Sequence, residues 1–476
     1  MITPRLSLLD PEDANRFHEA SLRLLSEMGV VIEDKTAIEV LDAAGAAVDL
    51  RSNIVRIPAD VLDKLIHQAP REFVLGGRSG RRENLMGGKE LLTRPVVGCL
   101  FITDREGKHR RARTVDASKI ARLVDAVDEY TWNAAAVYPD DVESSVCDVA
   151  YCKILFETTT KHFCISAYTP ESLSYMVEMA EAVAGSPEKL RLAPLFNIVM
   201  ATTSPMKYSK NQVGWIARAG KVGIPVGIAS TPLMGATGPV TLAGCIVQMN
   251  AENLAGVALS QALNPGAPVY YCSRPTLLDM RTGNSLWGPI EMGMIDAAAI
   301  QVARRYQIPS DVLSLRTDAK SMDEQAAYER MSNSLMPALA GVNSIAGAGM
   351  LEFVNAVSEE QLVIDAEILT MIRRVVRGID TDEESMSLEV IEAVGHQGQF
   401  LAEQHTRRHH RSEFCETRLA DRSLFNQWAQ AGGRDIVEAA AERAKSLLTR
   451  HEVEPLDPGV MRELESILLS SGKNLG

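Results

Sequence analysis

Short apolar runs alternate with helix-forming stretches over the central part of the chain. Most of these runs lack a strict apolar-polar alternation, which is typical of strands buried on both faces of a parallel sheet. The runs lie near residues 100–103, 132–138, 163–168, 194–201, 224–230, 268–273, 311–315 and 343–350, and each precedes a helical stretch. Eight such pairs predict an α/β protein with a (β/α)8 TIM barrel. An open doubly wound sheet stays the alternative, because a sequence does not show whether a sheet closes.

The pattern changes on both sides of this central part. Residues 11–30 and 58–69 show helical spacing, whereas the stretch from Glu72 to Thr103 is richer in β-formers and glycines. After Asp380, an acidic run and then a His- and Arg-rich segment replace the barrel pattern. We therefore expect three regions: an N-terminal α+β extension (1–99), the barrel (100–379) and a helical C-terminal region (380–476).

One Gly- and Thr-rich loop, from Pro232 to Gly244, follows the apolar strand near residues 224–230. Glycines let bare backbone approach a ligand, and Pro239 suits the first residue of the helix that follows. The N-terminus of a helix favours an anionic group. We expect this loop to face a ligand through Gly235, Thr237 and Gly238. The alternative is a sharp strand-to-helix turn that binds nothing.

Composition points to a small substrate or a protein partner. The 49 basic and 62 acidic side chains give a net charge of −13, which opposes binding to nucleic acid or an anionic membrane. The seven cysteines are odd in number and form no Cys-x-x-Cys pair, so neither a disulfide framework nor a zinc cluster is indicated. The N-terminus lacks a secretion-signal pattern, and prolines interrupt the uncharged stretch 222–251. We expect a cytoplasmic protein.

Polar and aromatic side chains follow several predicted strands, where a barrel carries its functional residues. Aromatic faces attract a quaternary ammonium group and a fixed cation holds a carboxylate, so this mixture suits a zwitterion. The alternatives are aromatic packing and an ion pair of Asp318 with Lys320 or Arg316. The binding candidates are Tyr138, Tyr168, Asn197, Tyr270, Arg316, Asp318, Lys320, Glu352 and Phe353, with Arg274 also at a strand end.

Other chemistries lack their motifs. His405 and His409 lie one helical turn apart, but Arg407, Arg408 and Arg411 surround them with positive charge, so we expect a basic helix rather than a metal site. The chain has no phosphate-binding Gly-x-x-x-x-Gly-Lys loop, no Gly-x-Ser-x-Gly elbow and no Gly-x-Gly-x-x-Gly dinucleotide fingerprint. These absences leave nucleotide hydrolysis, serine-hydrolase chemistry and dinucleotide redox without support.

Several ordered motifs together resemble the trimethylamine methyltransferase (MttB-type) superfamily. They are the stretch from Pro232 to Gly244, Asn264 to Tyr270, Asp279 to Gly283, Thr317 to Glu329, Ala340 to Asn343, His405-Thr406 and Asp421-Arg422. The resemblance implies a TIM barrel whose cavity receives a methylated amine, and onto which a cognate corrinoid protein docks to present cobalt(I) as the nucleophile. Because this chain lacks the corrinoid-binding signature Asp-x-His-x-x-Gly, cobalamin is expected on that partner and no cofactor is expected to bind tightly here.

The resemblance also has departures that bear on the substrate. The founding trimethylamine enzymes contain pyrrolysine in the cavity, whereas this chain has only the twenty ordinary residue types. Relatives without pyrrolysine include enzymes that demethylate quaternary amines such as glycine betaine. The segments from Leu313 to Arg316 and from Ser344 to Gly349 also differ from many relatives at two strand ends. We therefore regard the pocket as altered and Arg316 as a candidate for binding the substrate carboxylate.

The resulting hypothesis is a methyltransferase that moves a methyl group from glycine betaine to cobalt(I) of a corrinoid protein and leaves dimethylglycine. Proline betaine, carnitine, γ-butyrobetaine or choline as substrate stays open, as does a non-catalytic betaine-binding or corrinoid-docking protein. A third alternative is a barrel lyase or hydrolase that uses Asp318, Lys320 and Glu352 as acid and base groups. Catalytic residues stay unassigned, no metal is expected, and a homo-oligomer is possible.

Overall fold

The chain folds around a parallel barrel, in a computed structural model that describes residues 5–78, 80 and 84–475. Eight parallel strands form one sheet in the order β6-β19-β18-β15-β13-β11-β10-β9. These strands are β6 (Leu92–Pro95), β9 (Asn133–Ala134), β10 (Phe163–Ile165), β11 (Phe196–Ala201), β13 (Val226–Ser230), β15 (Val269–Ser273), β18 (Ser310–Leu313) and β19 (Ser344–Ala348).

Hydrogen bonds between the two outer strands of that order close the barrel. The carbonyl oxygen of Thr93 accepts from the backbone N–H of Thr131 and of Trp132, and the N–H of Cys99 donates to the carbonyl oxygen of Ala136. Closure leaves no free sheet edge in the core. The predicted (β/α)8 barrel is confirmed, and the open sheet is not the fold.

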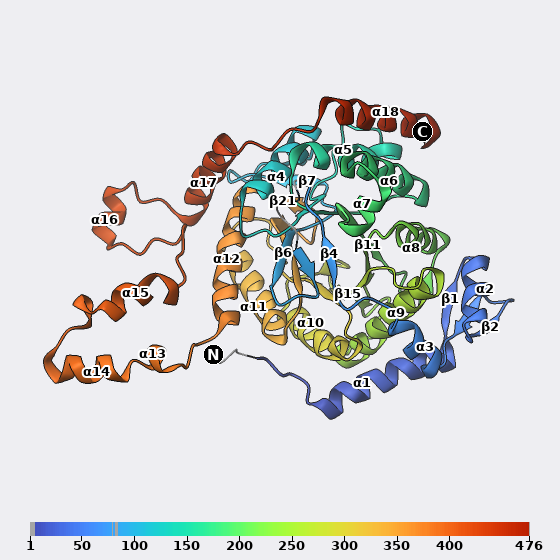
Figure 1. The fold of residues 1–476 in the computed structure, drawn as a ribbon, viewed down its shortest axis with the longest axis horizontal. Coiled ribbons are helices and arrows are strands. Elements are labelled where there is room, and N and C mark those ends of the chain that lie inside the picture. Colours follow the sequence, from blue (N-terminus) through green and yellow to red (C-terminus); the bar gives the residue numbers. More distant parts are fainter. Residues whose placement is uncertain (1–4, 79, 81–83, 476) are drawn as a thin grey trace.

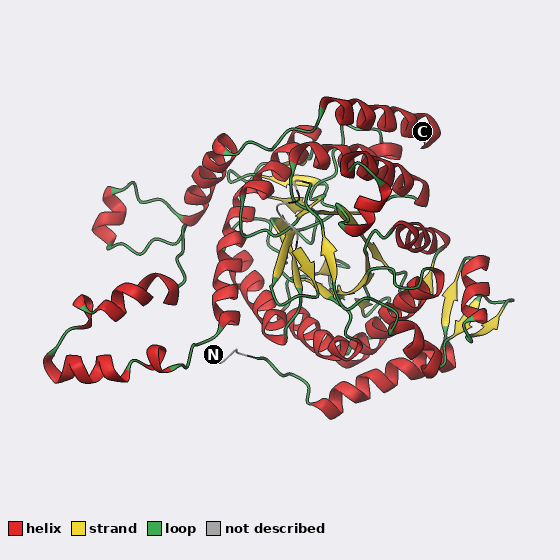
Figure 2. Ribbon diagram, in the orientation of Figure 1, coloured by secondary structure: helices red, strands yellow, loops and turns green. Residues whose placement is uncertain are grey.

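Helices surround the strands as a ring, which Figures 1 and 2 show with the strands at the centre. The ring consists of α4 (Thr114–Ala126), α5 (Cys147–Thr158), α6 (Pro170–Ala184), α8 (Lys210–Val222), α9 (Leu242–Leu263), α10 (Ile290–Ala303), α11 (Glu324–Ala340) and α12 (Glu359–Arg377), with the short α7 (Pro187–Leu192) after α6. Side-chain oxygens of Thr169, Ser209 and Ser358 cap their helices by accepting from the backbone three residues on. Among the described residues, no helix combines the length and the apolar composition that crossing a bilayer requires.

The first barrel strand is where the sequence prediction was wrong. The predicted run at 100–103 is β7 (Phe101–Thr103), which pairs with β8 (His109–Arg111) and β21 (Ala356–Val357) in a small separate sheet. The first barrel strand is β6, because Leu92 and Thr93 pair with Ser344 and Ile345. A charged Arg94 and a proline interrupt the apolar pattern of β6, which concealed it. The other seven predicted runs coincide with barrel strands.

Residues before the barrel form two units. One consists of α1 (Pro11–Arg23), a π-helical turn (Leu24–Met28), α2 (Lys35–Ala43), α3 (Ala59–Ile66) and the sheet strands β1 (Val30–Ile32), β2 (Ala47–Asp49) and β3 (Ile54–Arg56). Strand β12 (Lys207–Tyr208), from a barrel loop, joins this sheet beside β1. The other unit is the hairpin of β4 (Phe73–Leu75) and β5 (Asn84–Met86).

The β4–β5 hairpin covers the N-terminal end of the barrel. Gly76 N–H donates to the carbonyl oxygen of Pro194 at 2.8 Å and Arg78 N–H to that of Thr160 at 2.9 Å, and both acceptors lie in the short segments before barrel strands β11 and β10. Leu75 and Met86 pack with the inward-facing barrel residues. Figure 1 shows β4 lying across the ring of strands. The hairpin therefore closes this end, whereas barrel enzymes carry their active sites at the opposite, C-terminal end.

Short strands also follow the barrel strands at the C-terminal end. One sheet combines β14 (Leu233–Met234), β16 (Thr276–Leu278) and β17 (Ser285–Leu286), and β20 (Met350–Leu351) adds to the sheet of β7, β8 and β21. These strands lie in the loops after β6, β13, β15 and β19. They therefore give the rim of the C-terminal mouth a fixed backbone.

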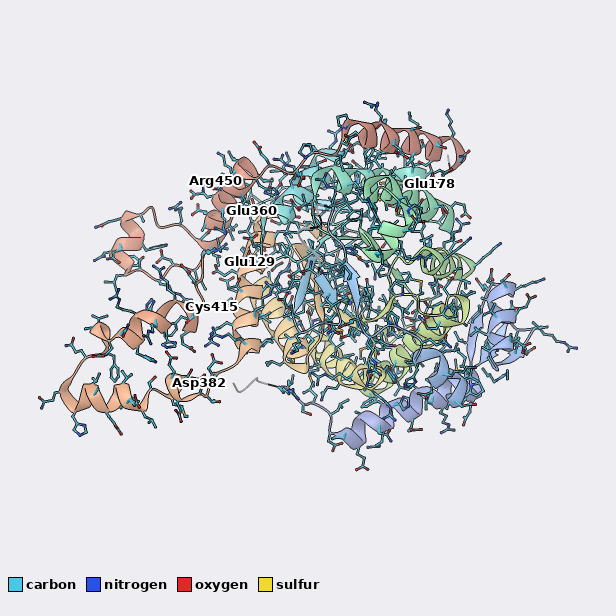
Figure 3. The ribbon with its side chains drawn as sticks, in the orientation of Figure 1. Glu129, Glu178, Glu360, Asp382, Cys415 and Arg450 are labelled. Atoms are coloured by element: carbon cyan, nitrogen blue, oxygen red, sulfur yellow. The ribbon has the colours of Figure 1, made fainter. Side chains whose placement is uncertain are left out.

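The C-terminal region is helical, as expected. It comprises α13 (Glu383–Met386), α14 (Leu388–Val394), α15 (Gln404–Glu413), α16 (Phe425–Gln430), α17 (Ile436–Arg450) and α18 (Pro458–Leu475). Helices α17 and α18 pack on the barrel helices, whereas α13 to α16 form an arm that stands away from the body in Figure 1. Figure 3 labels Asp382 near the start of this arm and Cys415 where the chain returns toward α12. The division of the chain at residues 99 and 379 stays a prediction.

A buried histidine lies near the covered end of the barrel. His162 Nδ1 is 2.8 Å from the carbonyl oxygen of Pro194, and Nε2 is 3.0 Å from Oδ1 of Asn197. Burial lowers the pKa of His162 to about 4, and its hydrogen bonds only partly oppose this effect. The imidazole is therefore neutral in the folded protein at pH values where the unfolded chain, with a pKa of about 6.5, takes up a proton.

We expect this histidine to make the fold less stable as the pH falls below about 6.5, because the unfolded state then binds the extra proton. The free energy of unfolding should fall by about 2 kcal/mol between pH 7.5 and pH 5 through His162 alone. Urea unfolding of His162→Gln should lack this part of the pH dependence, whereas the exposed His396→Gln should keep it. Equal pH dependence in wild type and His162→Gln would contradict the assignment.

Candidate functional site

Several inward-facing side chains near the C-terminal end of the barrel are accessible to solvent. Val199 belongs to the inward-facing cluster, whereas its neighbours Ile198 and Met200 pack into the core between sheet and helices. Because side chains alternate along a strand, Ala201 also faces inward. Val199 is partly exposed and Ala201 is exposed, although both lie on a central barrel strand.

The same accessibility recurs on the neighbouring strands. Ser166 lies two residues beyond the inward-facing Cys164, Thr231 lies two beyond the inward-facing Ala229, and Val97 packs on the same interior cluster. Each of these side chains is partly exposed. Together with Val199 and Ala201 they form a group of accessible side chains toward the C-terminal end of the interior, and we call the space beside them the chamber. All five side chains are uncharged and small or medium in size.

Among the described residues, three charged side chains lie in the barrel interior: one on β6, one on β18 and one directly after β15. Arg94 Nη2 is 3.0 Å from Oδ2 of Asp311, and Nη2 of Arg274 donates to the same oxygen. Arg274 Nη1 also donates to the carbonyl oxygens of Ser273 at 2.8 Å and of Asp311 at 3.1 Å. The Arg94 guanidinium carbon lies 5.1 Å from the ring centroid of Trp132, within range of a cation–π contact. We call Arg94, Arg274 and Asp311 the interior triad.

Electrostatics keep all three members of the triad charged. Burial raises the pKa of Asp311, but Arg94 and Arg274 more than offset it and hold that pKa below its usual range. Burial likewise opposes the charge of each arginine, yet Asp311 keeps the pKa of both above the usual value. Burial raises the pKa of the nearby Cys164 and Cys272, so both are neutral thiols. The triad therefore carries a net charge of about +1.

Arg316, the predicted carboxylate ligand, lies behind the barrel wall. Its Nη2 donates to Oδ2 of Asp296 on α10, and its Nη1 donates to the carbonyl oxygen of Pro275 at 3.3 Å. Ser273 Oγ donates to the other Asp296 oxygen at 2.6 Å. Burial raises the pKa of Asp296 to about 6, although Arg316 opposes this shift. The geometry thus gives Arg316 a partner within the chain.

Four other predicted residues lie together after β18 and β19. Lys320 Nζ lies 4.2 Å from the centroid of the Phe353 ring and donates to the backbone oxygen of Asp318 at 2.7 Å. Glu352 N–H donates to the carbonyl oxygen of Ala319 at 2.8 Å. The Asp318 carboxylate accepts from Trp287 N–H at 2.8 Å, and burial raises the pKa of Asp318. This part of the rim is a connected polar and aromatic group.

The turn that carries Glu352 and Phe353 has an uncommon backbone. Glu352, Phe353 and Val354 have φ angles of 50°, 56° and 69°. Left-handed backbone is costly for residues with a β-carbon, most of all for a β-branched one such as Val354. Hydrogen bonds from Leu100 and Phe101 N–H to the carbonyl oxygen of Asn355 tie the turn to β7. Strain of this kind is frequent at functional sites.

Tyr138 and Tyr168 meet after the adjacent strands β9 and β10. Their ring centroids are 5.4 Å apart, and Tyr138 Oη donates to the carbonyl oxygen of Ser166 at 3.1 Å. Tyr138 is buried, whereas 40% of Tyr168 is exposed. Tyr168 is thus the member of the pair that a ligand at the mouth can contact.

Asn197 and Tyr270 lie deeper than the other candidates. Asn197 Nδ2 is 2.6 Å from Tyr270 Oη, and the Tyr270 ring lies 6.3 Å from Phe73 of the hairpin that covers the N-terminal end. Both side chains are buried. The structure therefore brings these two together with His162, and apart from the residues at the mouth.

The Gly-rich loop is held by its own turn and by α9. Thr237 Oγ1 accepts from Leu233 N–H at 3.0 Å, and the Thr237 carbonyl oxygen accepts from Gln248 Nε2 at 2.8 Å. Gly235 has a φ of 89°, a left-handed conformation that favours glycine, so the backbone alone accounts for a glycine at this position. Helix α9 begins at Leu242 with Thr241 as its cap, so Pro239 is not its first residue. Gly235 and Thr237 are exposed, and Gly238 is partly exposed.

The basic helix does not assemble a metal site. Nε2 of His405 is 2.8 Å from Ser387 Oγ, and Nε2 of His409 is 3.1 Å from Oε1 of Glu384. In the described part of the chain, no group of three or more His, Cys, Asp or Glu side chains could hold a metal ion.

Sequence reasoning missed two members of the interior triad. Arg94 lies in the stretch that was assigned to the N-terminal extension, and Asp311 begins a predicted run but was not considered. The sequence did contain one signal for them. A single charged residue inside an otherwise apolar strand must have a buried partner of opposite charge, so Arg94 and Asp311 each implied such a pair. The sequence analysis placed Arg274 at a strand end but did not identify Asp311 as its partner.

Comparisons with known proteins match nearly the whole chain. A family model described as "Trimethylamine methyltransferase (MTTB)" matches residues 2–471. Trimethylamine methyltransferase MttB of Desulfitobacterium hafniense is 34% identical over 458 residues, covering 96% of this chain and 92% of that protein. The corresponding protein of Methanosarcina barkeri is 33% identical over 475 residues, covering 98% and 96%.

A glycine betaine methyltransferase of Desulfitobacterium hafniense is 31% identical over 477 residues, covering 100% of this chain and 99% of that protein. Among solved structures, the MtmB protein in a hydroxylamine complex matches with a TM-score of 0.53 at 12% identity, covering 98% of this chain and 92% of that one. The structural likeness supports the fold.

The Arg316–Asp296 pair generates a stability prediction. Arg316→Met leaves a buried carboxylate without its cation, so the free energy of unfolding at pH 7.5 should fall by about 3 kcal/mol. The loss should shrink toward pH 5.5, because a protonated Asp296 needs no cation. Urea unfolding should show that the double variant Arg316→Met, Asp296→Asn loses less than the sum of the single variants. An unchanged stability of Arg316→Met would refute the pairing.

Proposed function

The chain belongs to the trimethylamine methyltransferase (MTTB) family, and on that premise we propose that it removes one methyl group from a quaternary amine. The methyl group would pass to cobalt(I) of a separate corrinoid protein. The preferred substrate in this proposal is glycine betaine, which leaves as dimethylglycine. The relative named as a glycine betaine methyltransferase, similar over its full length, supports this choice.

The observation that carries the proposal is that the five accessible side chains of the chamber are uncharged, in contrast to the buried interior triad and the charged rim. None of these five side chains, Val97, Ser166, Val199, Ala201 and Thr231, can readily protonate a nitrogen atom. A quaternary nitrogen needs no such proton, because it already carries the positive charge that makes the departing tertiary amine neutral. The lining therefore fits a substrate that brings its own charge.

The residues around the chamber also fit a reaction with an external acceptor. Because the chamber opens at the C-terminal mouth, a methyl group inside it can be approached from outside the barrel. When bound, the corrinoid supplies the nucleophile. The part of this chain is to hold the amine with one methyl–nitrogen bond directed outward, a positioning effect that can contribute several kcal/mol.

Tyr168 is a candidate for contacting the ammonium group at the rim. Its ring is partly exposed and its position is fixed by Tyr138 and by Asp148, whose carboxylate accepts from Tyr168 N–H at 2.7 Å. An aromatic face contributes on the order of 1 kcal/mol to binding a quaternary ammonium group. Carnitine, proline betaine, γ-butyrobetaine and choline share that group and stay alternative substrates.

A corrinoid assay tests the reaction. Purified protein, free cob(I)alamin and each amine are mixed without oxygen, and methylcobalamin is followed by its absorbance. We expect methylcobalamin and dimethylglycine in equal amounts from glycine betaine, and neither product when cob(I)alamin or the protein is omitted. Activity with trimethylamine but with no quaternary amine would refute the substrate class. Consumption of the amine without a corrinoid would indicate a lyase or hydrolase instead.

Replacing Tyr168 tests the rim contact. Tyr168→Ala should lower kcat/KM for the active quaternary amine about fivefold, as expected for the loss of one aromatic contact. Tyr168→Phe keeps the ring and should stay within twofold of wild type. Tyr328→Ala, an exposed tyrosine on α11, is the matched control and should change nothing. Equal values for Tyr168→Ala and wild type would remove Tyr168 from the site.

A further inference from the structure

Charges within and behind the barrel wall do not balance. The interior triad adjoins the Arg316–Asp296 pair, since Arg274 influences the pKa of Asp296. Together these groups comprise three arginines, Arg94, Arg274 and Arg316, and two acids, Asp296 and Asp311. Because Asp318 also acts on Arg316, the excess positive charge belongs to the interior triad, in which two arginines share the single carboxylate of Asp311. Uncompensated charge is costly in a buried setting, so the excess favours an anionic ligand.

The three arginines differ in their exposure and in their acidic partners. Arg316 is fully enclosed at 0% exposure and lies against α10, whereas Arg274 retains 6% and Arg94 retains 2%. Arg274 and Arg94 both share Asp311, so neither has a carboxylate of its own. The Nε atoms of Arg94 and Arg316 both lack a hydrogen-bond partner among the described residues, but Arg316 has the carboxylate of Asp296 as its own partner. Arg274 and Arg94 are therefore the cations that can accept a second anion.

We propose that Arg274, supported by Arg94, binds the carboxylate of the amine substrate inside the barrel. The inference rests on the proposed function and specifies its substrate class as an amine that carries a carboxylate. A guanidinium group matches a carboxylate with a planar pair of donors. Arg274 thereby takes the role in binding the substrate carboxylate that the sequence predicted for Arg316.

This anchor also orients the reacting end of the substrate. Arg274 follows β15 directly and its guanidinium turns back to Asp311 on the neighbouring strand β18. A carboxylate held there directs the ammonium group toward the uncharged chamber residues, such as Ser166, Ala201 and Thr231. Its methyl groups then lie on the side of the mouth. Choline, which lacks the carboxylate, can fill the chamber but cannot use the anchor.

Binding measurements on the full chain test the anchor without any corrinoid. Calorimetry compares choline with three carboxylated amines, glycine betaine, carnitine and γ-butyrobetaine. Wild type should bind at least one carboxylated amine about 10- to 100-fold more tightly than choline, the effect of a charged hydrogen-bonded pair. Arg274→Gln should lose this preference while its affinity for choline changes less than about threefold. Arg274→Lys keeps the charge without the planar donors and should retain part of the preference.

The variants are chosen so that folding does not decide the outcome. Arg274→Gln leaves Asp311 paired with Arg94, so no buried carboxylate loses its last cation. Arg373→Gln is the matched control, because Arg373 contacts the same strand β6 from the helix side, where its Nη2 donates to Thr93 Oγ1 at 2.9 Å. It should keep the wild-type preference. Thermal unfolding of each variant checks its stability.

Two results would overturn the anchor: a wild type that binds no carboxylated amine more tightly than choline, or an Arg274→Gln variant that retains the preference. The first result needs only the wild type, so it holds even if a variant does not fold. These measurements distinguish failure of the carboxylate anchor from failure of the proposed methyl transfer. A carboxylate preference that depends on Arg274, without methyl transfer to any corrinoid, would keep the anchor and refute the proposed function. Methyl transfer to a corrinoid without any preference for carboxylated amines would keep the proposed function and refute the anchor.

Discussion

The pairing of buried charges is the constraint on which the rest of this structure depends. Inside the barrel Asp311 pairs with Arg94 and Arg274, behind the wall Asp296 pairs with Arg316, and Asp365 on α12 lies 2.9 Å from Arg330 on α11. Removing one partner of such a pair costs several kcal/mol because the other charge stays buried. Each pair joins segments that are distant in sequence, so the same contacts that neutralise charge also hold strands and helices in register. In the interior triad two arginines share one carboxylate, so the pairing of charge there is incomplete.

Carboxylates on the outer helices hold the loops at the mouth in a second, repeated arrangement. Asp148 on α5 accepts from Tyr168 N–H, Glu252 on α9 from Met206 N–H, Glu329 on α11 from Asp318 N–H and Asp365 on α12 from Gly349 N–H. In each case an acid from a helix binds the backbone of a loop that follows a barrel strand. Hydrogen bonds to a charged acceptor are stronger than neutral ones. The rim can therefore keep a defined shape around a small substrate, which positioning requires.

The sequence predicted a feature correctly where the signal for it lay in neighbouring residues. Seven barrel strands were predicted correctly because strands buried in a parallel sheet form continuous apolar runs. Strand β6 was missed because Arg94 and Pro95 break its apolar run. Of the candidate side chains, the groups after β9 and β10 and after β18 and β19 lie at the mouth, whereas Asn197 and Tyr270 lie near the covered end. Sequence position near a strand does not give depth along the barrel axis.

The sequence by itself determined the family, the barrel and its helical C-terminal region, since these depend on motifs and on periodic patterns that neighbouring residues carry. Only the tertiary structure decided which arginine faces the interior. Arg274 and Arg316 both follow predicted strands, yet one side chain turns back to Asp311 and the other pairs with Asp296 on α10. That choice depends on the direction of a side chain relative to partners 37 and 20 residues away in sequence. Buried charges select their partners in space, and only closure of the barrel brings those partners together.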